Sequence, residues 1–93
     1  MKAIRVYEPG EPTVMRLEDV PLPEPGPDQV RLKIAAAGVN FIDVYQRSGQ
    51  YVIDLPFTPG MEGAGVVDAV GADVTAFAPG DRVAFGFTRG SYA

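Results

Sequence analysis

Glycine and proline interrupt this chain so often that no long helix or strand can form. The 93 residues include 11 Gly and nine Pro. Proline lacks a backbone N–H donor and Pro-Gly pairs favour tight turns, so these residues end or bend regular elements. The sequence therefore predicts short strands joined by turns, with room for one short helix.

Several segments alternate between apolar and polar residues, as half-buried strands do. The expected strands cover residues 2–7, 15–18, 30–34 (continued by the small residues 35–38), 63–70 and 82–85. Residues 21–27 carry a proline at every second position and should form an extended surface connection. We expect a mainly β fold, a partly open barrel with one short helix.

The one helix is expected from Phe41 to Ser48. Asn40 is a preferred N-cap residue, and Gly49 suits the C-terminal stop. Asp43 in the first turn suits the helix dipole, and its spacing from Arg47 allows an exposed ion pair. Helical spacing also places four residues on one face: Phe41, Val44, Tyr45 and Ser48.

Composition excludes several classes of function. The chain has no Cys and no His, which removes disulfides, thiol nucleophiles, imidazole bases and the usual zinc ligands. The net charge is −4 and the basic residues are dispersed, so a nucleic-acid partner is not expected. No apolar run approaches the roughly 18–20 residues of a membrane span, and the N-terminus lacks a secretory signal, so a cytoplasmic location without membrane insertion is expected.

The glycines do not form a dinucleotide fingerprint. Gly60, Gly63 and Gly65 are spaced Gly-x-x-Gly-x-Gly and precede an expected strand. A fingerprint has the order Gly-x-Gly-x-x-Gly and opens a helix. These glycines are predicted to serve turns and strand packing. The chain alone should therefore have no pyrophosphate site.

Two stretches, residues 38–51 and 59–71, resemble substrate-side motifs of the medium-chain dehydrogenase/reductase superfamily. Where its zinc-dependent alcohol dehydrogenases have a ligating cysteine and histidine, this chain has Asn40 and Met61. The chain therefore most closely resembles the zinc-free, NADPH-dependent quinone oxidoreductases. The resemblance covers residues 1–93 and implies an incomplete GroES-like domain, with the dinucleotide-binding domain outside this chain.

The resemblance also implies site residues. Asn40, Asp43 and Tyr45 would be catalytic, Asn40, Tyr45 and Tyr51 would contact NADPH, and no metal would be bound. An Asn amide both donates and accepts hydrogen bonds. A Tyr ring can stack on a flat ligand ring while its hydroxyl forms a hydrogen bond with the ligand. Each of these residues also has a purely structural alternative. Asn40 could only cap the helix, Asp43 could form the ion pair with Arg47, and Tyr45 could belong to the core. Met61 is expected to line a pocket and Glu62 to make a structural hydrogen bond.

The implied reaction is hydride transfer from NADPH to a quinone without zinc. The alternatives are a zinc-free reductase of activated alkenes, such as enones or enoyl thioesters, and a non-catalytic co-chaperonin-like module. The full-length protein is expected to be a homodimer, and the isolated chain is expected to be inactive.

Overall fold

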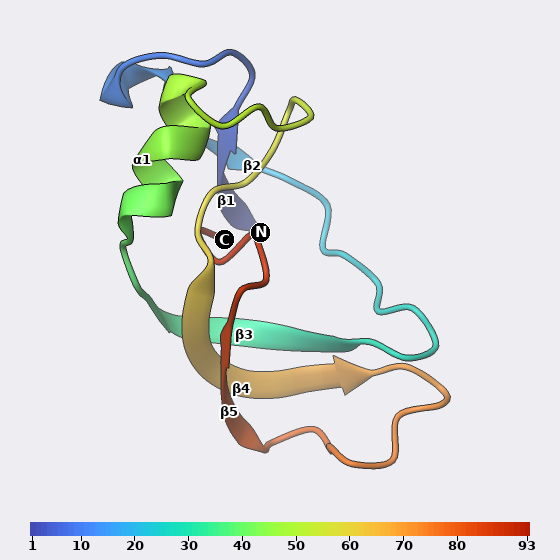
Figure 1. Ribbon diagram of the computed structural model, residues 1–93. Coiled ribbons are helices and arrows are strands. Elements are labelled where there is room, and N and C mark those ends of the chain that lie inside the picture. Colours follow the sequence, from blue (N-terminus) through green and yellow to red (C-terminus); the bar gives the residue numbers. More distant parts are fainter.

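The computed structural model describes all 93 residues and contains two small antiparallel sheets (Figure 1). In the first, β1 (Lys2–Val6) pairs with β2 (Met15–Asp19), and a short 3-10 helix (Pro12–Val14) lies between them in the chain. The second has the strand order β3-β4-β5. Its members are β3 (Val30–Ala37), β4 (Glu62–Val70) and β5 (Arg82–Gly86).

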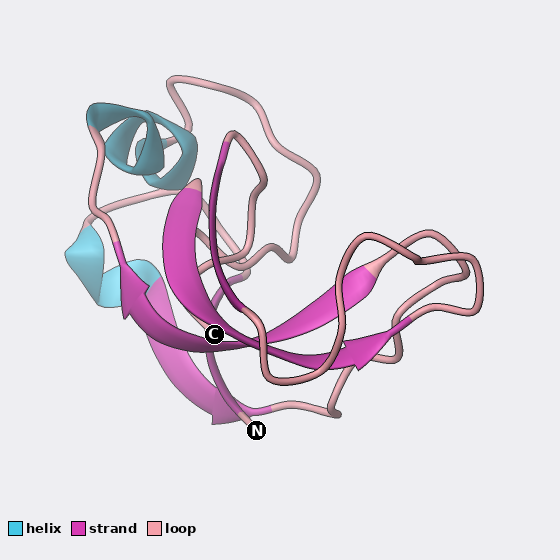
Figure 2. Cartoon of the chain, turned by 90° about the horizontal axis from the view of Figure 1, so that it is seen from below, coloured by secondary structure: helices cyan, strands magenta, loops and turns pink.

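The helix α1 (Phe41–Ser48) follows β3 and is the one α-helix of the chain. Its bounds agree with the expected ones, whereas the 3-10 helix was not predicted. With eight residues, α1 is too short to cross a membrane. The second sheet curves strongly, and neither sheet closes on itself (Figure 2). The expected mainly β, partly open barrel with one short helix is confirmed.

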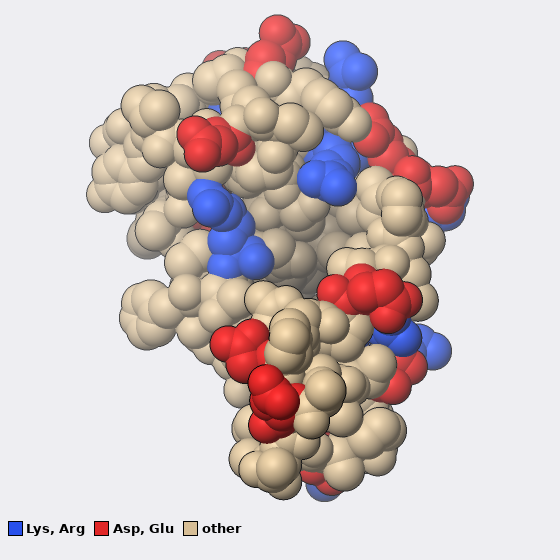
Figure 3. Space-filling view, turned by 90° about the vertical axis from the view of Figure 1, so that its right-hand side faces the viewer, with Lys and Arg blue, Asp and Glu red and all other residues tan.

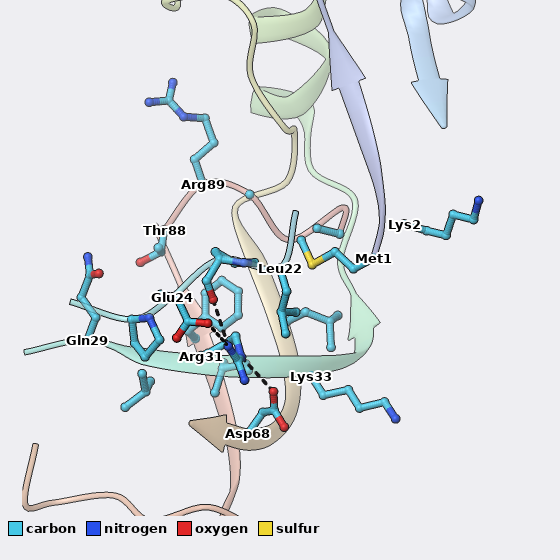
Figure 4. Close-up of a pocket in the computed structure, with 18 residues that line it drawn as sticks. Met1, Lys2, Leu22, Glu24, Gln29, Arg31, Lys33, Asp68, Thr88 and Arg89 are labelled. Atoms are coloured by element: carbon cyan, nitrogen blue, oxygen red, sulfur yellow. Dashed lines mark hydrogen bonds and ion pairs between the residues drawn. The ribbon is translucent and has the colours of Figure 1, made fainter. Parts of the chain in front are cut away.

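Residues 21–26 form an extended segment that connects the two sheets, as predicted, whereas Pro27, the last residue of the predicted connection, lies in a turn. Arg31 of β3 holds it, because its guanidinium donates to the carbonyl oxygen of Pro23 at 3.1 Å and lies 3.6 Å from Glu24 (Figure 4). The same guanidinium donates to Asp68 of β4 at 2.8 Å. One side chain therefore ties the connection to two strands of the second sheet.

The apolar core is small. Its buried apolar side chains are Ala3, Val6, Phe57 and Val67. Val6 and Phe57 also exchange backbone hydrogen bonds of 2.9 and 3.1 Å, which join β1 to the loop before β4. Many large apolar side chains stay exposed, so burial alone does not fix every element in place.

Close packing between β3 and β4 depends on glycine. A Cβ added to Gly65 would overlap the backbone carbonyl of Lys33 on β3. Gly60 lies in the loop before β4 at φ 98°, a conformation that other residues rarely adopt. The predicted packing role is confirmed for Gly65, whereas Gly60 has a left-handed backbone in a loop and not in the predicted turn.

Replacing Gly65 with Ala should destabilise the protein by about 2 kcal/mol or more, because the clash is with backbone that cannot rotate away. Gly86→Ala is the matched control: a Cβ on that β5 residue meets nothing within 4 Å. It should change stability by less than about 1 kcal/mol. Urea unfolding of the protein containing this chain measures both, and equal midpoints for the two variants would contradict the packing described.

Candidate functional site

α1 turns its apolar side outward and its polar side inward. Phe41 is 80% exposed and Val44 is also exposed, whereas Asp43 is only 4% exposed and Gln46 is buried. No strand makes an extensive contact with the helix. The face predicted from helical spacing exists, but three of its four members, Phe41, Val44 and Ser48, are exposed. We call these residues and Tyr45 the outer face. Tyr45 is half-buried and does not belong to the apolar core.

The N-terminal end of α1 is capped mainly through Asp43. The backbone N–H of Asn40 donates to Oδ2 of Asp43 at 2.9 Å. The N–H of Asp43 donates to the backbone carbonyl oxygen of Asn40 at 3.0 Å, and the Asn40 side chain faces that same N–H. Asn40 therefore lies at the predicted N-cap position, but the side-chain hydrogen bond that closes the cap comes from Asp43.

Asp43 also bonds to a residue far along the chain. The hydroxyl of Tyr92 donates to Oδ2 of Asp43 at 3.0 Å. The alternative expectation of an exposed Asp43–Arg47 ion pair was wrong: the chain's ion pairs involve Lys2 and Arg31 only. The reason is that Asp43 points inward, toward Tyr92. No local sequence pattern predicts this contact, because the two residues are 49 positions apart.

Tyr92 is itself firmly held. Its N–H donates to the carbonyl oxygen of Pro59 at 3.0 Å, and its carbonyl oxygen accepts from the N–H of Ile4 at 2.8 Å. Its ring lies against Gly60, where a Cβ would come within 2.6 Å of it. Burial, and secondly the hydrogen bond to Asp43, raise the pKa of Tyr92 to about 12. The hydroxyl therefore keeps its proton at neutral pH and acts as a donor.

The C-terminal end of α1 carries two tyrosines. Gly49 ends the helix in the left-handed conformation, as predicted. Beyond it, the N–H of Tyr51 donates to the carbonyl oxygen of Tyr45 at 3.0 Å. The two rings meet edge to face with centroids 5.3 Å apart, and Tyr51 is 48% exposed. The structure thus brings the two predicted tyrosines together, Tyr45 on the outer face and Tyr51 just beyond the helix.

A cavity of about 150 Å³ lies near the N-terminal end of α1. Its lining residues are Asn40, Ile42, Met61, Glu62, Gly86 and Phe87. The strand register explains this meeting, because the end of β3 pairs with the start of β4, which pairs with the end of β5. Asn40 and Met61, which the sequence singled out in separate motifs, therefore line one cavity.

Two other residues of this cavity behave differently from expectation. Glu62 is exposed and its side chain lies against Gly38 without a hydrogen bond, so the structural bond expected of it is not formed. Phe87 was not predicted; it is 96% exposed and has φ 61°, a left-handed conformation that is strained for a bulky residue. Nothing in the local sequence signals either feature.

A larger hollow lies elsewhere, between the two sheets. It measures about 930 Å³ and is lined by Met1 and Lys2, the extended connection, β3 and residues 88–90 (Figure 4). Figure 3 shows a hollow with Lys and Arg side chains around it. It contains none of the predicted site residues, and its Arg31 is already paired with carboxylates. The smaller cavity, with the outer face and the tyrosine pair, is therefore the candidate site.

Metal-ligating side chains do not cluster in the structure. No group of three or more Asp, Glu, His or Cys residues is placed to hold a metal ion. Asn40 and Met61 offer an amide and a thioether, and neither is a usual ligand of zinc.

Comparisons with known proteins agree on one family. The model of the alcohol dehydrogenase GroES-like domain matches residues 26–92. The quinone oxidoreductase of Sus scrofa is 50% identical over 89% of this chain and 26% of that protein. The solved structure of Escherichia coli quinone oxidoreductase complexed with NADPH matches with a TM-score of 0.96 at 34% identity, over 100% of this chain and 29% of the other.

A second solved structure, mycobacterial Rv1454c complexed with NADPH, matches with a TM-score of 0.92 at 48% identity. It covers 100% of this chain and 30% of that one. The chain therefore spans between a quarter and a third of the length of these relatives.

The raised pKa of Tyr92 predicts a stability that falls at high pH. Folded Tyr92 holds its proton to about pH 12, whereas the ordinary value is 10.0. The stabilisation is therefore fully present below pH 10 and is lost as pH rises from 10 to 12. Urea unfolding should show that the free energy of unfolding of the wild type is larger than that of Tyr92→Phe. The difference should be constant below pH 10 and should shrink toward pH 12. A difference that stays the same up to pH 12 would contradict this.

Proposed function

Because the chain belongs to the alcohol dehydrogenase GroES-like domain family, we propose that it is the substrate-side domain of an NADPH-dependent quinone oxidoreductase. The observation that carries the proposal is the shared cavity of Asn40 and Met61, the two residues at the positions where zinc-dependent members have their ligands. The names of the similar proteins support a quinone as the acceptor and NADPH as the reductant.

The site fits the nicotinamide end of NADPH. A flat ring with a carboxamide group needs an apolar surface and an amide-type partner. The tyrosine pair and the outer face supply the exposed apolar surface, and Asn40 supplies the amide. Gly65 of the second motif serves the β3–β4 contact and Gly60 a left-handed loop position, which supports a role in packing and not in binding a pyrophosphate. The remainder of the cofactor would be bound by residues outside this chain.

When bound, NADPH supplies the hydride. The residues of this chain orient the acceptor and exclude water from it. Phe87 and Met61 form the apolar wall of the cavity, where a planar acceptor can lie against them. The Asn40 amide can donate to the acceptor oxygen on which negative charge develops. Asp43 fixes Asn40 and does not touch the acceptor, because its carboxylate is buried and bonded to Asn40 and Tyr92.

The proposed reaction does not require a metal. Reduction of a quinone gives an aromatic product, so orientation and hydrogen bonding suffice. The full-length protein should oxidise NADPH with 1,4-benzoquinone faster than with an enone, and dialysis against EDTA should leave the rate unchanged. Stoichiometric zinc whose removal abolishes the rate would contradict the zinc-free mechanism. A clear preference for the enone would instead assign the alkene reductase.

Tyr51→Ala should raise the KM for NADPH about tenfold or more, because loss of a stacked aromatic ring costs about 1–3 kcal/mol. Steady-state kinetics of the full-length protein at saturating quinone measure this. Tyr7→Ala is the matched control, since Tyr7 is 46% exposed but lies at the end of β1 and bonds to Glu18 of β2. Its KM for NADPH should not change. An unchanged KM in Tyr51→Ala would count against contact between Tyr51 and the cofactor.

A further inference from the structure

We infer that Tyr92 is a positioning residue of this site: through Asp43 it holds the first turn of α1, and with it Asn40, at the cavity. The inference rests on the proposed function for its catalytic consequence. Tyr92 does not line the cavity, so any effect on the reaction must pass through the residues between them.

One carboxylate oxygen makes the connection. Oδ2 of Asp43 accepts the Tyr92 hydroxyl at 3.0 Å and the Asn40 N–H at 2.9 Å. The other oxygen, Oδ1, is buried without a hydrogen-bond partner. Asp43 therefore has no alternative bond to replace that of Tyr92.

The bond to Tyr92 differs in kind from the bond to Asn40. Asn40 and Asp43 belong to the same helix cap, so their hydrogen bond moves with the helix and cannot fix it to the rest of the protein. Tyr92 is anchored outside the helix, by backbone bonds to Pro59 and Ile4. No other side-chain hydrogen bond joins α1 to a distant part of the chain.

The helix needs such an anchor because the strands of the two sheets make little contact with it. The outer face is turned to solvent, and no strand makes an extensive contact with α1. Its C-terminal end is held separately, where the N–H of Gly10 donates to the carbonyl oxygen of Arg47 at 2.9 Å. Loss of the Tyr92 hydroxyl should therefore loosen the N-terminal end, at Asn40, and leave the tyrosine pair near the other end in place.

The test uses Tyr92→Phe in the full-length protein, with Tyr7→Phe as the matched control. Both variants remove one tyrosine hydroxyl from a carboxylate; that of Tyr7 donates to Glu18 at 2.6 Å, away from the site. The aromatic ring that Tyr92→Phe retains would still lie against Gly60. We expect kcat per NADPH-binding site to fall about tenfold in Tyr92→Phe, with the KM for NADPH within about twofold of wild type. Tyr7→Phe should keep both values.

Normalising kcat to titrated NADPH-binding sites removes any loss due to unfolded protein. A wild-type kcat per site in Tyr92→Phe would overturn the inference. The effect must also depend on Asp43: in an Asp43→Asn background, which keeps the side-chain shape, Tyr92→Phe should lower kcat by a smaller factor. The same factor in both backgrounds would show that Tyr92 acts by another route and would equally overturn the inference.

Hydrogen exchange separates failure of this inference from failure of the proposed function. If the wild-type protein does not reduce quinones with NADPH, the proposed function is wrong, and exchange of the amides of residues 41–44 decides whether the link exists. Faster exchange there in Tyr92→Phe than in Tyr7→Phe supports the link. Equal exchange in the two variants would overturn it.

Discussion

The buried carboxylate of Asp43 determines how α1 sits in this domain. A helix normally packs its apolar side on a core, but here Asp43 and Gln46 face inward, and Phe41 and Val44 face solvent. Burying a polar group is costly unless it is hydrogen-bonded; Oδ2 of Asp43 accepts hydrogen bonds from Asn40 and Tyr92, while Oδ1 has no partner. Polar bonds thus fix the helix and leave Phe41 and Val44 on its apolar side exposed.

The second sheet determines what lies beside that helix. Small residues in β4 let β3 approach closely, and the register pairs Ala37 with Gly63 and Glu62 with Gly86. Three chain segments therefore end side by side, and each contributes to the cavity: Asn40 after β3, Met61 before β4 and Phe87 after β5. Sheet pairing and the Asp43 bond together place an amide, a thioether and an aromatic ring around one small space.

The sequence predicted the elements well and their orientation poorly. The alternation of apolar and polar residues, and the ending of elements at Gly and Pro, depend only on neighbouring residues. The strands, the bounds of α1 and the extended connection could therefore be predicted. The direction in which α1 faces depends on Tyr92, which is 49 residues from Asp43, and periodicity carries no information about it.

The candidate site divides in the same way. The resemblance to a family identified Asn40, Tyr45 and Tyr51, and the structure brings the two tyrosines together at one end of α1 and Asn40 to the cavity at the other. Their roles in catalysis and cofactor binding stay predictions. Phe87 and Tyr92 were missed because each acquires its place only through the pairing of distant segments.

The most direct measurement is a crystal structure of the full-length protein with NADPH. The account predicts the nicotinamide ring against Tyr45 or Tyr51, with its carboxamide at about 2.7–3.2 Å from the Asn40 amide. A nicotinamide bound elsewhere, with the outer face of α1 still in solvent, would contradict it.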